Sequence, residues 1–285
     1  MVKAKKPERL GYINMLVFGD PGSGETVFAG SADAYSDTGR ALFIDAESGT
    51  TSLYEFYPDI DVVSITSIQD FQDIYEFLRK HLKLAAIYEG RVTHDKIDKK
   101  DAKRRLIKLQ ADLYDVKPET IKEPRLYNTV IMDTFTEMQK YVMADITGTD
   151  ASSLNLKEEL NMPTLNDWGR NSETVRLIAR TFRNLDMHTI LTCHAQESKD
   201  DKTGATEILP DLPGKLARQI MGFVDIVGYL YVPSKKDDDE DDSFRNVLIT
   251  RPQGKYVAKD RFDKLGSHIE MPTIEKIIKK IKGDE

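Results

Sequence analysis

Residue types that can bind a phosphate group are concentrated in one short segment near the N-terminus. The segment consists of Gly19, Asp20, Pro21, Gly22, Ser23, Gly24, Glu25 and Thr26. It follows an apolar run over 12–18 that predicts a buried strand, and it precedes a run over 27–32 that can open a helix. Glycines let the backbone turn tightly and bring N–H groups close to an anion, and the positive end of the following helix points at the same place. The spacing therefore predicts a phosphate-binding loop.

One position departs from the phosphate-loop pattern G-x-x-x-x-G-K-S/T, because Glu25 stands where the pattern has lysine. Two unit charges about 4 Å apart interact by roughly 4 kcal/mol at an effective dielectric constant near 20, so replacing attraction by repulsion is expected to weaken nucleotide binding strongly. Two explanations remain open: Glu25 is an engineered or damaged version of a working loop, or the protein has given up tight triphosphate binding. The intact residues around it favour the first. A glycine-rich turn without a ligand is the alternative to both.

Acidic residues follow two further apolar runs. Residues 41–44 lead into a segment that contains Asp45 and Glu47, and residues 130–132 lead directly into Asp133. In open α/β sheets, ligands bind at the edge where the carboxyl ends of the strands lie. Asp133 is therefore a candidate to hold Mg²⁺ through water, with Thr26 as the direct ligand. An apolar run that ends in aspartate is common by chance. It is informative here only because the predicted phosphate-binding loop precedes it in the chain.

Length and composition limit the class of protein. The chain has 285 residues, 40% of them hydrophobic, which is enough for one large or two small domains with a proper core. Its net charge of −7 means that any contact with nucleic acid must come from a local basic patch. The single cysteine, Cys193, excludes an internal disulfide and suits a reducing cytoplasm. No apolar run approaches the roughly 20 residues that span a bilayer. Residues 1–9 are basic and polar and are not followed by the apolar segment of a signal peptide.

The rest of the chain alternates short apolar runs with helical periodicity. Strands are predicted over 41–44, 62–65, 130–133, 189–193, 223–232, 247–250 and 256–258, and helices over 134–145, 168–185 and 274–281. The two segments 247–250 and 256–258 are expected to pair across Gly254. Loops or turns are predicted over 148–167, 198–206 and 209–215, and the acidic run 237–242 is expected at an exposed hairpin tip.

Residues 83–123 differ in composition from the rest of the chain, because they are charged and helix-prone. They lie between two predicted strands and lengthen the connection between them. Ala102, Leu106, Leu109 and Leu113 fall on one helical stripe, so we interpret the segment as a helical insertion in the core domain. Its basic residues between 96 and 108 are either a solvated helix face or a surface that contacts a phosphate backbone.

Cys193 ends the strand predicted over 189–193 and His194 follows it, and both residue types can bind zinc. The chain has no C-x-x-C motif and no second paired histidine, so a buried thiol is the better interpretation of Cys193. Gln196 lies just past the same strand, where it could either sense a γ-phosphate or belong to a simple loop.

Taken together, these residues resemble the RecA-like P-loop ATPases, most closely the phage single-strand-annealing and recombination ATPases, which are AAA-type phage nucleotide-binding proteins. The resemblance covers nearly the whole chain apart from 83–123. Residues 19–26 match the Walker A loop of the family except at Glu25, and residues 130–133 match its Walker B strand. Each of these two motifs is generic by itself.

Three further matches make the resemblance more specific. Glu47 matches the family glutamate that orients the attacking water, and Gln196 occupies the place of the glutamine that couples nucleotide state to the DNA-binding loop. The segment Lys259-Asp260-Arg261-Phe262 is similar to the Lys-Asn-Arg-Phe motif of RadA-type members, although its second residue differs. In that motif the cations reach the phosphates of the neighbouring subunit, which implies roles for Lys259 and Arg261.

The resemblance implies an α/β fold: a RecA-like P-loop NTPase core with a mainly parallel sheet flanked by helices, a helical insertion and a C-terminal β-hairpin region, all in one domain over 1–285. It also implies ATP and Mg²⁺ as ligands, a homo-oligomeric ring or filament, single-stranded DNA and a single-strand-binding protein as partners, and the cytoplasm of a host cell. The family's two DNA loops correspond to 148–167 and 197–214. Their basic candidates are Lys157, Arg170, Lys199, Lys202 and Lys215.

Two functions from different classes follow. The first is an ATP-dependent, single-stranded-DNA-binding recombination or annealing protein in which Glu25 impairs ATP binding or hydrolysis. The second is a scaffold or regulator that retains the fold without hydrolysing nucleotide, and Glu25 is its main support. An unrelated P-loop kinase is disfavoured, because the sequence has no arginine-rich lid and no motif for a small acceptor.

Overall fold

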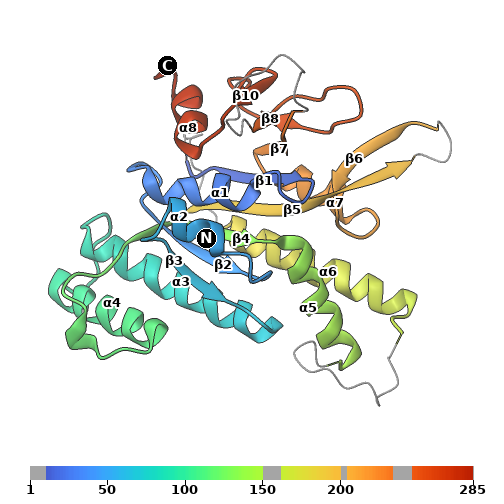
Figure 1. Cartoon of the computed structure of the whole chain (residues 1–285). Coiled ribbons are helices and arrows are strands. Elements are labelled where there is room, and N and C mark those ends of the chain that lie inside the picture. The colour runs from blue at the N-terminus through green and yellow to red at the C-terminus, as the bar shows by residue number, and fades with distance from the viewer. Residues whose placement is uncertain (1–10, 150–161, 200–203, 234–245, 285) are drawn as a thin grey trace.

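The computed structural model describes residues 11–149, 162–199, 204–233 and 246–284 (Figure 1). The strands are β1 (Asn14–Gly19), β2 (Arg40–Asp45), β3 (Asp61–Ser64), β4 (Tyr127–Asp133), β5 (His188–Lys199), β6 (Thr206–Pro210), β7 (Ile226–Tyr231), β8 (Val247–Ile249), β9 (Lys259–Asp260) and β10 (His268–Glu270). The helices are α1 (Glu25–Gly30), η1 (Ser31–Ala34), α2 (Thr51–Phe56), α3 (Ile68–Tyr88), α4 (Lys99–Tyr114), η2 (Pro118–Thr120), α5 (Phe135–Thr147), α6 (Leu165–Arg183), α7 (Leu216–Phe223) and α8 (Ile274–Lys282).

The strands form one sheet in the order β10-β8-β7-β1-β5-β4-β2-β3, with β6 paired to β5 and β9 to β7. The pairs from β7 across to β3 are parallel, and the antiparallel strands β8, β9 and β10 extend the β7 side. The predicted α/β class, with a mainly parallel sheet flanked by helices, is confirmed.

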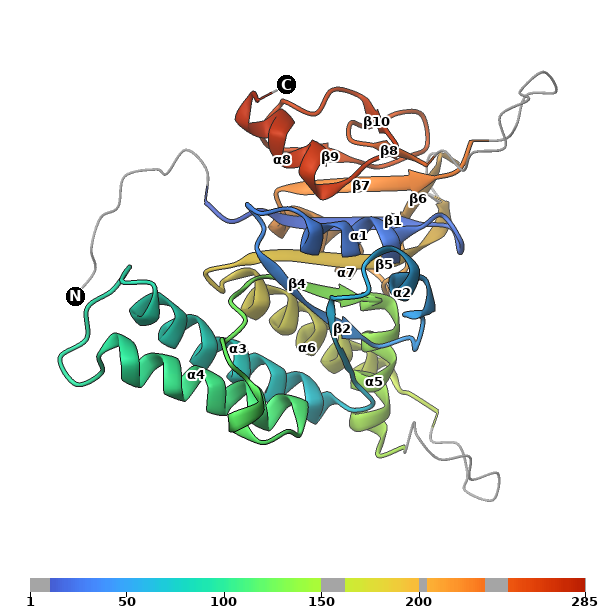
Figure 2. The same cartoon turned by 60° about the vertical axis from the view of Figure 1, so that its left-hand side comes forward.

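Helices cover both faces of the sheet, and alternate residues of each strand serve the two faces. In β1, Leu16 and Phe18 belong to a core cluster that also takes side chains from α3, α5, α6 and α7. Met15 and Val17 point to the other cluster, which is closed by α1, α2 and α8. Figures 1 and 2 show these two helical layers on opposite sides of the sheet. Burial on both faces explains why the central strands read as unbroken apolar runs.

The register brings three polar strand ends together. Gly19 at the end of β1 pairs with His194 on β5. Asp45 at the end of β2 pairs with Asp133 at the end of β4. The phosphate-loop candidate and both acidic segments therefore lie at the same edge of the sheet.

The C-terminal third differs most from the sequence prediction. Residues 247–250 were expected to pair with 256–258, but β8 pairs with β7 and β10 instead, so this prediction is wrong. Across Gly254, Gln253 and Tyr256 form an isolated bridge, and Tyr256 also bridges to Ile208. The expected strand over 223–232 begins at Ile226, because α7 continues to Phe223. Residue 206 was expected in a loop and residues 209–210 in a turn, but residues 206–210 form β6, which pairs with an extended β5 to make a projecting hairpin (Figure 1).

The charged segment after β3 forms two packed helices, α3 and α4. Ser67 caps α3 in a reciprocal pair with Asp70, and Asp98 caps α4. The predicted stripe on α4 is confirmed, since Ala102 and Leu106 are fully buried and the two leucines that follow on the same stripe pack against the core. No helix in the described ranges is long and apolar enough to cross a membrane.

Candidate functional site

The loop between β1 and α1 has the backbone of a phosphate cradle. Gly22 and Gly24 adopt φ values of 85° and 93°, which side chains other than glycine rarely tolerate. The Ser23 N–H donates to the Asp20 carbonyl at 3.0 Å, which closes the turn before α1 begins. At Gly19, a Cβ would lie 2.4 Å from the Leu230 carbonyl oxygen and 2.2 Å from Ser23 Oγ, so only glycine fits.

Side chains from β7 and from the start of β8 brace this loop. Tyr229 on β7 donates from its hydroxyl to Asp20 Oδ2 at 3.1 Å. Asn246, just before β8, donates from Nδ2 to the Ser23 carbonyl at 2.9 Å. These two contacts hold the loop from the side of the sheet that carries the antiparallel strands.

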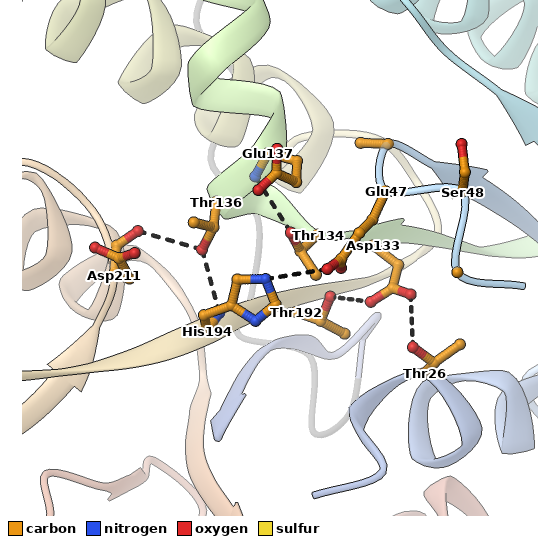
Figure 3. A network of polar contacts seen from close by, with 12 residues as sticks. Thr26, Glu47, Ser48, Asp133, Thr134, Thr136, Glu137, Thr192, His194 and Asp211 are labelled. Atoms are coloured by element: carbon orange, nitrogen blue, oxygen red, sulfur yellow. Dashed lines mark hydrogen bonds and ion pairs between the residues drawn. The ribbon is translucent and has the colours of Figure 1, made fainter. Parts of the chain in front are cut away.

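Thr26 and Asp133, the two predicted metal ligands, are in direct contact. Thr26 Oγ1 donates to Asp133 Oδ2 at 2.8 Å, and the Thr192 hydroxyl on β5 donates to the other carboxylate oxygen (Figure 3). Asp133 is buried, and burial raises the pKa of its carboxyl group. The structure therefore places a hydroxyl and a carboxylate, both suitable for Mg²⁺, side by side at the start of α1.

Glu47 is positioned by Asp45, the last residue of β2. The buried Asp45 carboxylate accepts hydrogen bonds through Oδ1 from the N–H groups of Glu47 at 3.1 Å and Ser48 at 2.8 Å. This turn directs the half-exposed Glu47 side chain toward β5, where Oε1 lies 3.3 Å from His194 Nε2 (Figure 3). Glu47 thus stands at the same sheet edge as Thr26 and Asp133.

His194 is the site residue that sequence reasoning missed. Its backbone N–H donates to Thr136 Oγ1 at 3.1 Å, and Thr136 in turn donates to the Asp211 carbonyl at 3.2 Å (Figure 3). Its ring contacts Glu47, and its register partner is Gly19 of the loop. From the sequence, His194 was considered only as a zinc ligand. Its position directly after the buried part of β5 was the signal that could have found it. Cys193 beside it is a buried free thiol, as predicted.

Gln196 lies two residues farther along β5, within the projecting hairpin. Its Nε2 donates to the carbonyls of Pro210 at 3.0 Å and Leu212 at 3.1 Å. The side-chain amide therefore ties the hairpin to the segment that leads into α7, while His194 is the β5 residue that contacts Glu47.

Lys259 and Arg261 lie at the opposite edge of the sheet from the loop. Lys259 Nζ donates to the carbonyls of Met221 at 3.0 Å and Val224 at 2.7 Å, near the C-terminal end of α7. Arg261 Nη1 lies 2.5 Å from Asp225 Oδ1, and the Asp225 N–H donates to the Asn14 carbonyl at the beginning of β1. The length of β1, about 17 Å for its five steps, separates these cations from the loop of the same chain.

Glu25 occupies the interior of the cradle. Its Oε1 is buried, has no hydrogen-bond partner among the described residues, and would lie 2.9 Å from a Cβ on Gly19. Burial raises the pKa of this carboxyl group, because the lost hydration of the charged form outweighs the partial compensation from its own backbone N–H and the Ser23 hydroxyl. The glycine backbone, Thr26 and Asp133 fit a magnesium-bound phosphate group, whereas the Glu25 side chain does not.

Comparison with known proteins identifies a family for this chain. No curated protein matches the sequence. Among solved structures, a KaiC-like protein from Pyrococcus horikoshii OT3 aligns at 13% identity and a TM-score of 0.36, over 85% of this chain and 80% of the other. The flagellar accessory protein FlaH from Methanocaldococcus jannaschii aligns at 11% identity and a TM-score of 0.34, over 84% of this chain and 78% of the other. A family profile described as an AAA domain matches residues 12–262. Because this match spans most of its length, the chain belongs to the AAA domain family of P-loop ATPases.

Proposed function

We propose that this protein is a RecA-like ATPase that binds single-stranded DNA and acts in recombination or annealing, and that Glu25 impairs its use of ATP. The observation that carries the proposal is the contact network of Figure 3, in which the Thr26–Asp133 pair and the Glu47–His194 pair meet at one sheet edge. Such an arrangement supports phosphoryl transfer to water, because it combines a metal site with a carboxylate that can orient the nucleophile.

The roles of the residues follow from their positions. Thr26 and Asp133 would hold Mg²⁺, which in turn would neutralise charge on the phosphates. Glu47 is the candidate for orienting water, since its side chain is half-exposed and is fixed by the Asp45 turn and His194. The N–H groups of the loop from Gly19 to Thr26 would bind the phosphates themselves.

Lys259 and Arg261 can serve this site only from a second copy of the chain. Within one chain they lie at the far edge of the sheet, where they contact α7 and Asp225. A cation that reaches a neighbour's phosphates makes turnover depend on assembly, so we propose a homo-oligomeric ring or filament. Light scattering with and without nucleotide and single-stranded DNA tests this, and a strict monomer under every condition contradicts it.

The β5–β6 hairpin is the proposed link between nucleotide and DNA. Strand β5 carries His194 beside the site and continues outward to Lys199, so one element joins the two functions. Lys199 and Lys215 are exposed near this hairpin, and Arg170 is exposed on α6. Lys157 and Lys202 lie outside the described residues. A single-strand-binding protein is the proposed partner in loading, in the cytoplasm of a host cell.

ATP turnover by this chain, measured beside that of Glu25→Lys, tests the enzymatic part of the proposal. The lysine variant should gain turnover that depends on Mg²⁺ and is stimulated by single-stranded DNA. Glu25→Gln is the matched control, since it removes the negative charge without supplying a cation. If the lysine variant binds ATP no better than the parent chain, the site is incomplete for another reason and the ATPase proposal fails.

A non-hydrolysing scaffold is the second candidate. It is favoured by the position of the Glu25 carboxyl, which is buried against Gly19 inside the loop where a phosphate would bind. This alternative is selected if Glu25→Lys binds ATP but does not turn it over, while assembly and DNA binding are unchanged.

A further inference from the structure

The helical segment after β3 is locally basic in an acidic chain. Residues 96–125 contain ten Lys or Arg and six Asp or Glu, whereas the whole chain has a net charge of −7. Most of these cations belong to α4, which packs with its other side on α3 and the core. A cationic element in a protein of opposite net charge concentrates a local positive field that attracts polyanions.

Four of the six cations of α4 lie on one face. This face, which we name the α4 face, consists of Lys100, Lys103, Arg104, Ile107 and Lys108. Their positions i, i+3, i+4, i+7 and i+8 form a continuous stripe on a helix. Lys100, Arg104 and Lys108 follow one another at a rise of about 6 Å, so the stripe is a row of regularly spaced positive charges.

A groove of about 420 Å³ runs along this stripe, with Pro118 of η2 as its other wall. Its surface is formed mainly by Ile107, Pro118 and the carbon stems of the lysines and arginine, while their charged groups stand at the rim. The segment that follows η2 is tied to α4, because the side-chain oxygen of Gln110 accepts a hydrogen bond from the Arg125 N–H at 3.0 Å. The α4 face is thus a preformed groove with a carbon floor and a cationic rim.

The positive charge of the α4 face is only partly neutralised within the chain. Arg104 shares Asp101 with Arg105, at 2.7 Å and 2.8 Å, so one carboxylate serves two guanidinium groups. Lys103 pairs with Glu123. Lys100 and Lys108 are exposed and form no ion pair within the described ranges.

We propose that the α4 face binds the phosphate backbone of nucleic acid. A row of cations about one helical turn apart matches a linear polyanion, and the carbon floor can accept its sugars. Two apolar residues offer too little surface for insertion into a membrane, which favours nucleic acid over a lipid surface. Figure 1 shows α4 and the β5–β6 hairpin at opposite ends of the molecule, so this contact is separate from the hairpin. The inference rests on the proposed function, since it gives the same nucleic acid a second contact.

The test is the salt dependence of nucleic-acid binding by the variant Lys100→Glu/Arg104→Glu/Lys108→Glu. Fluorescence anisotropy of a labelled oligothymidylate and of a labelled duplex is measured over a range of salt concentrations, so that the two kinds of strand are distinguished. The slope of log K against log salt is negative, and each lost phosphate contact reduces its magnitude by about 0.7 for single strands, so a reduction of about 2 is expected. Affinity at low salt should fall by more than about tenfold.

Two further variants make the result specific. Lys100→Gln/Arg104→Gln/Lys108→Gln neutralises the same positions without reversing their charge and should show most of the loss. Lys80→Glu/Lys140→Glu/Lys264→Glu changes the net charge equally at three exposed positions elsewhere and should bind almost as the parent chain does. Circular dichroism and urea unfolding establish that all three variants are folded.

The possible outcomes separate the two proposals. If the parent chain binds nucleic acid and the α4-face variants keep its affinity and slope, this inference is wrong while the proposed function stands. If the parent chain binds neither strand, both fail. The last measurement uses vesicles of anionic phospholipid. If the parent chain binds these vesicles but not nucleic acid, and the α4-face variants lose the vesicle binding, the face binds a membrane surface instead.

Discussion

The Thr26 hydroxyl donates to Asp133 Oδ2 across 2.8 Å, although the two residues are 107 positions apart. The contact joins the first turn of α1 to the end of β4, and the Thr192 hydroxyl secures the same carboxylate from β5. A buried carboxylate with two hydroxyl donors remains fixed in orientation, which a metal-binding site requires.

Replacing Thr26 by valine should destabilise the protein. Valine removes one of the donors to a buried carboxylate, and a lost hydrogen bond of this kind costs about 1–3 kcal/mol. Urea unfolding measures the change, with Thr26→Ser as the control that keeps the hydroxyl group. Equal stability of the valine and serine variants would mean that the contact contributes nothing to folding.

Glu25 should make the stability of the protein fall as the pH rises. Burial raises the pKa of this carboxyl group above its ordinary value of 4.5, so the folded state binds the proton more tightly than the unfolded state. The contribution is fully present below pH 4.5 and is lost as the pH rises through the folded-state pKa. The loss is about 1.4 kcal/mol for each pH unit that separates the pKa of the folded state from that of the unfolded state.

Glu25→Gln tests this because it has nearly the same shape and does not titrate. Urea unfolding of both proteins over a pH series should show the glutamine variant gaining relative stability as the pH rises. Parallel curves for the two proteins would mean that Glu25 titrates in the folded protein as it does in water.

His81 should have the opposite effect. The ring is fully buried on α3, its Nε2 accepts a hydrogen bond from the Tyr127 N–H at 3.0 Å, and burial lowers its pKa to about 4. The unfolded state therefore binds the proton more tightly, and stability is lost as the pH falls from 6.5 toward about 4. The loss is about 3 kcal/mol at the bottom of this window.

His81→Gln keeps an acceptor near the Tyr127 N–H but does not titrate, so its stability should vary less over this range. His188, whose pKa burial also lowers to about 4, provides an internal comparison. If the parent chain and His81→Gln lose stability in parallel between about pH 6.5 and 4, the buried ring is not the source.

How much of this site the sequence could predict depends on the range of the interactions. The loop over 19–26 and the strand before it were predicted, because glycine spacing and an apolar run are local signals. The three-residue strand β8 was given the wrong partner, since so short a segment cannot indicate which strand it joins. The contact between Glu47 and His194 depends on the order β5-β4-β2, which no local pattern contains.

The environment of single side chains was also beyond the sequence. Lys259 could be matched to a motif, but its three carbonyl partners at the end of α7 come from packing of β9 against β7. Glu25 was identified as a departure from the pattern, whereas the burial of its carboxyl group against Gly19 required the folded loop.

His194 should matter for turnover more than Gln196 does. In a Glu25→Lys background, His194→Ala removes the ring that contacts Glu47 Oε1, so kcat should fall about tenfold or more while the protein stays folded. Gln196→Ala is the control, since it loses contacts to the Pro210 and Leu212 carbonyls and should affect mainly the hairpin and DNA stimulation. A larger loss of kcat in Gln196→Ala would restore the sensor role to that residue.

The proposed action of Lys259 and Arg261 on a neighbouring copy predicts complementation between two inactive variants. One carries Glu25→Lys and Glu47→Gln, so its own site fails but its cations remain. The other carries Glu25→Lys and Arg261→Met, so its site is complete but it offers no guanidinium group. Because Arg261 lies at the far sheet edge from the loop of its own chain, a mixed assembly should contain junctions at which both requirements are met.

The complementation is measured as ATP turnover of the mixture, compared with that of each variant alone at the same total concentration. About a quarter of the junctions in an equal mixture place an intact arginine beside an intact site, so turnover should recover to about that fraction of the Glu25→Lys value. Loss of the Asp225 ion pair affects folding within one chain only, and urea unfolding of the Arg261→Met variant reports it separately. If mixing restores no turnover although light scattering shows that the variants assemble, Arg261 serves only the fold of its own chain, and its proposed action on a neighbouring site is wrong.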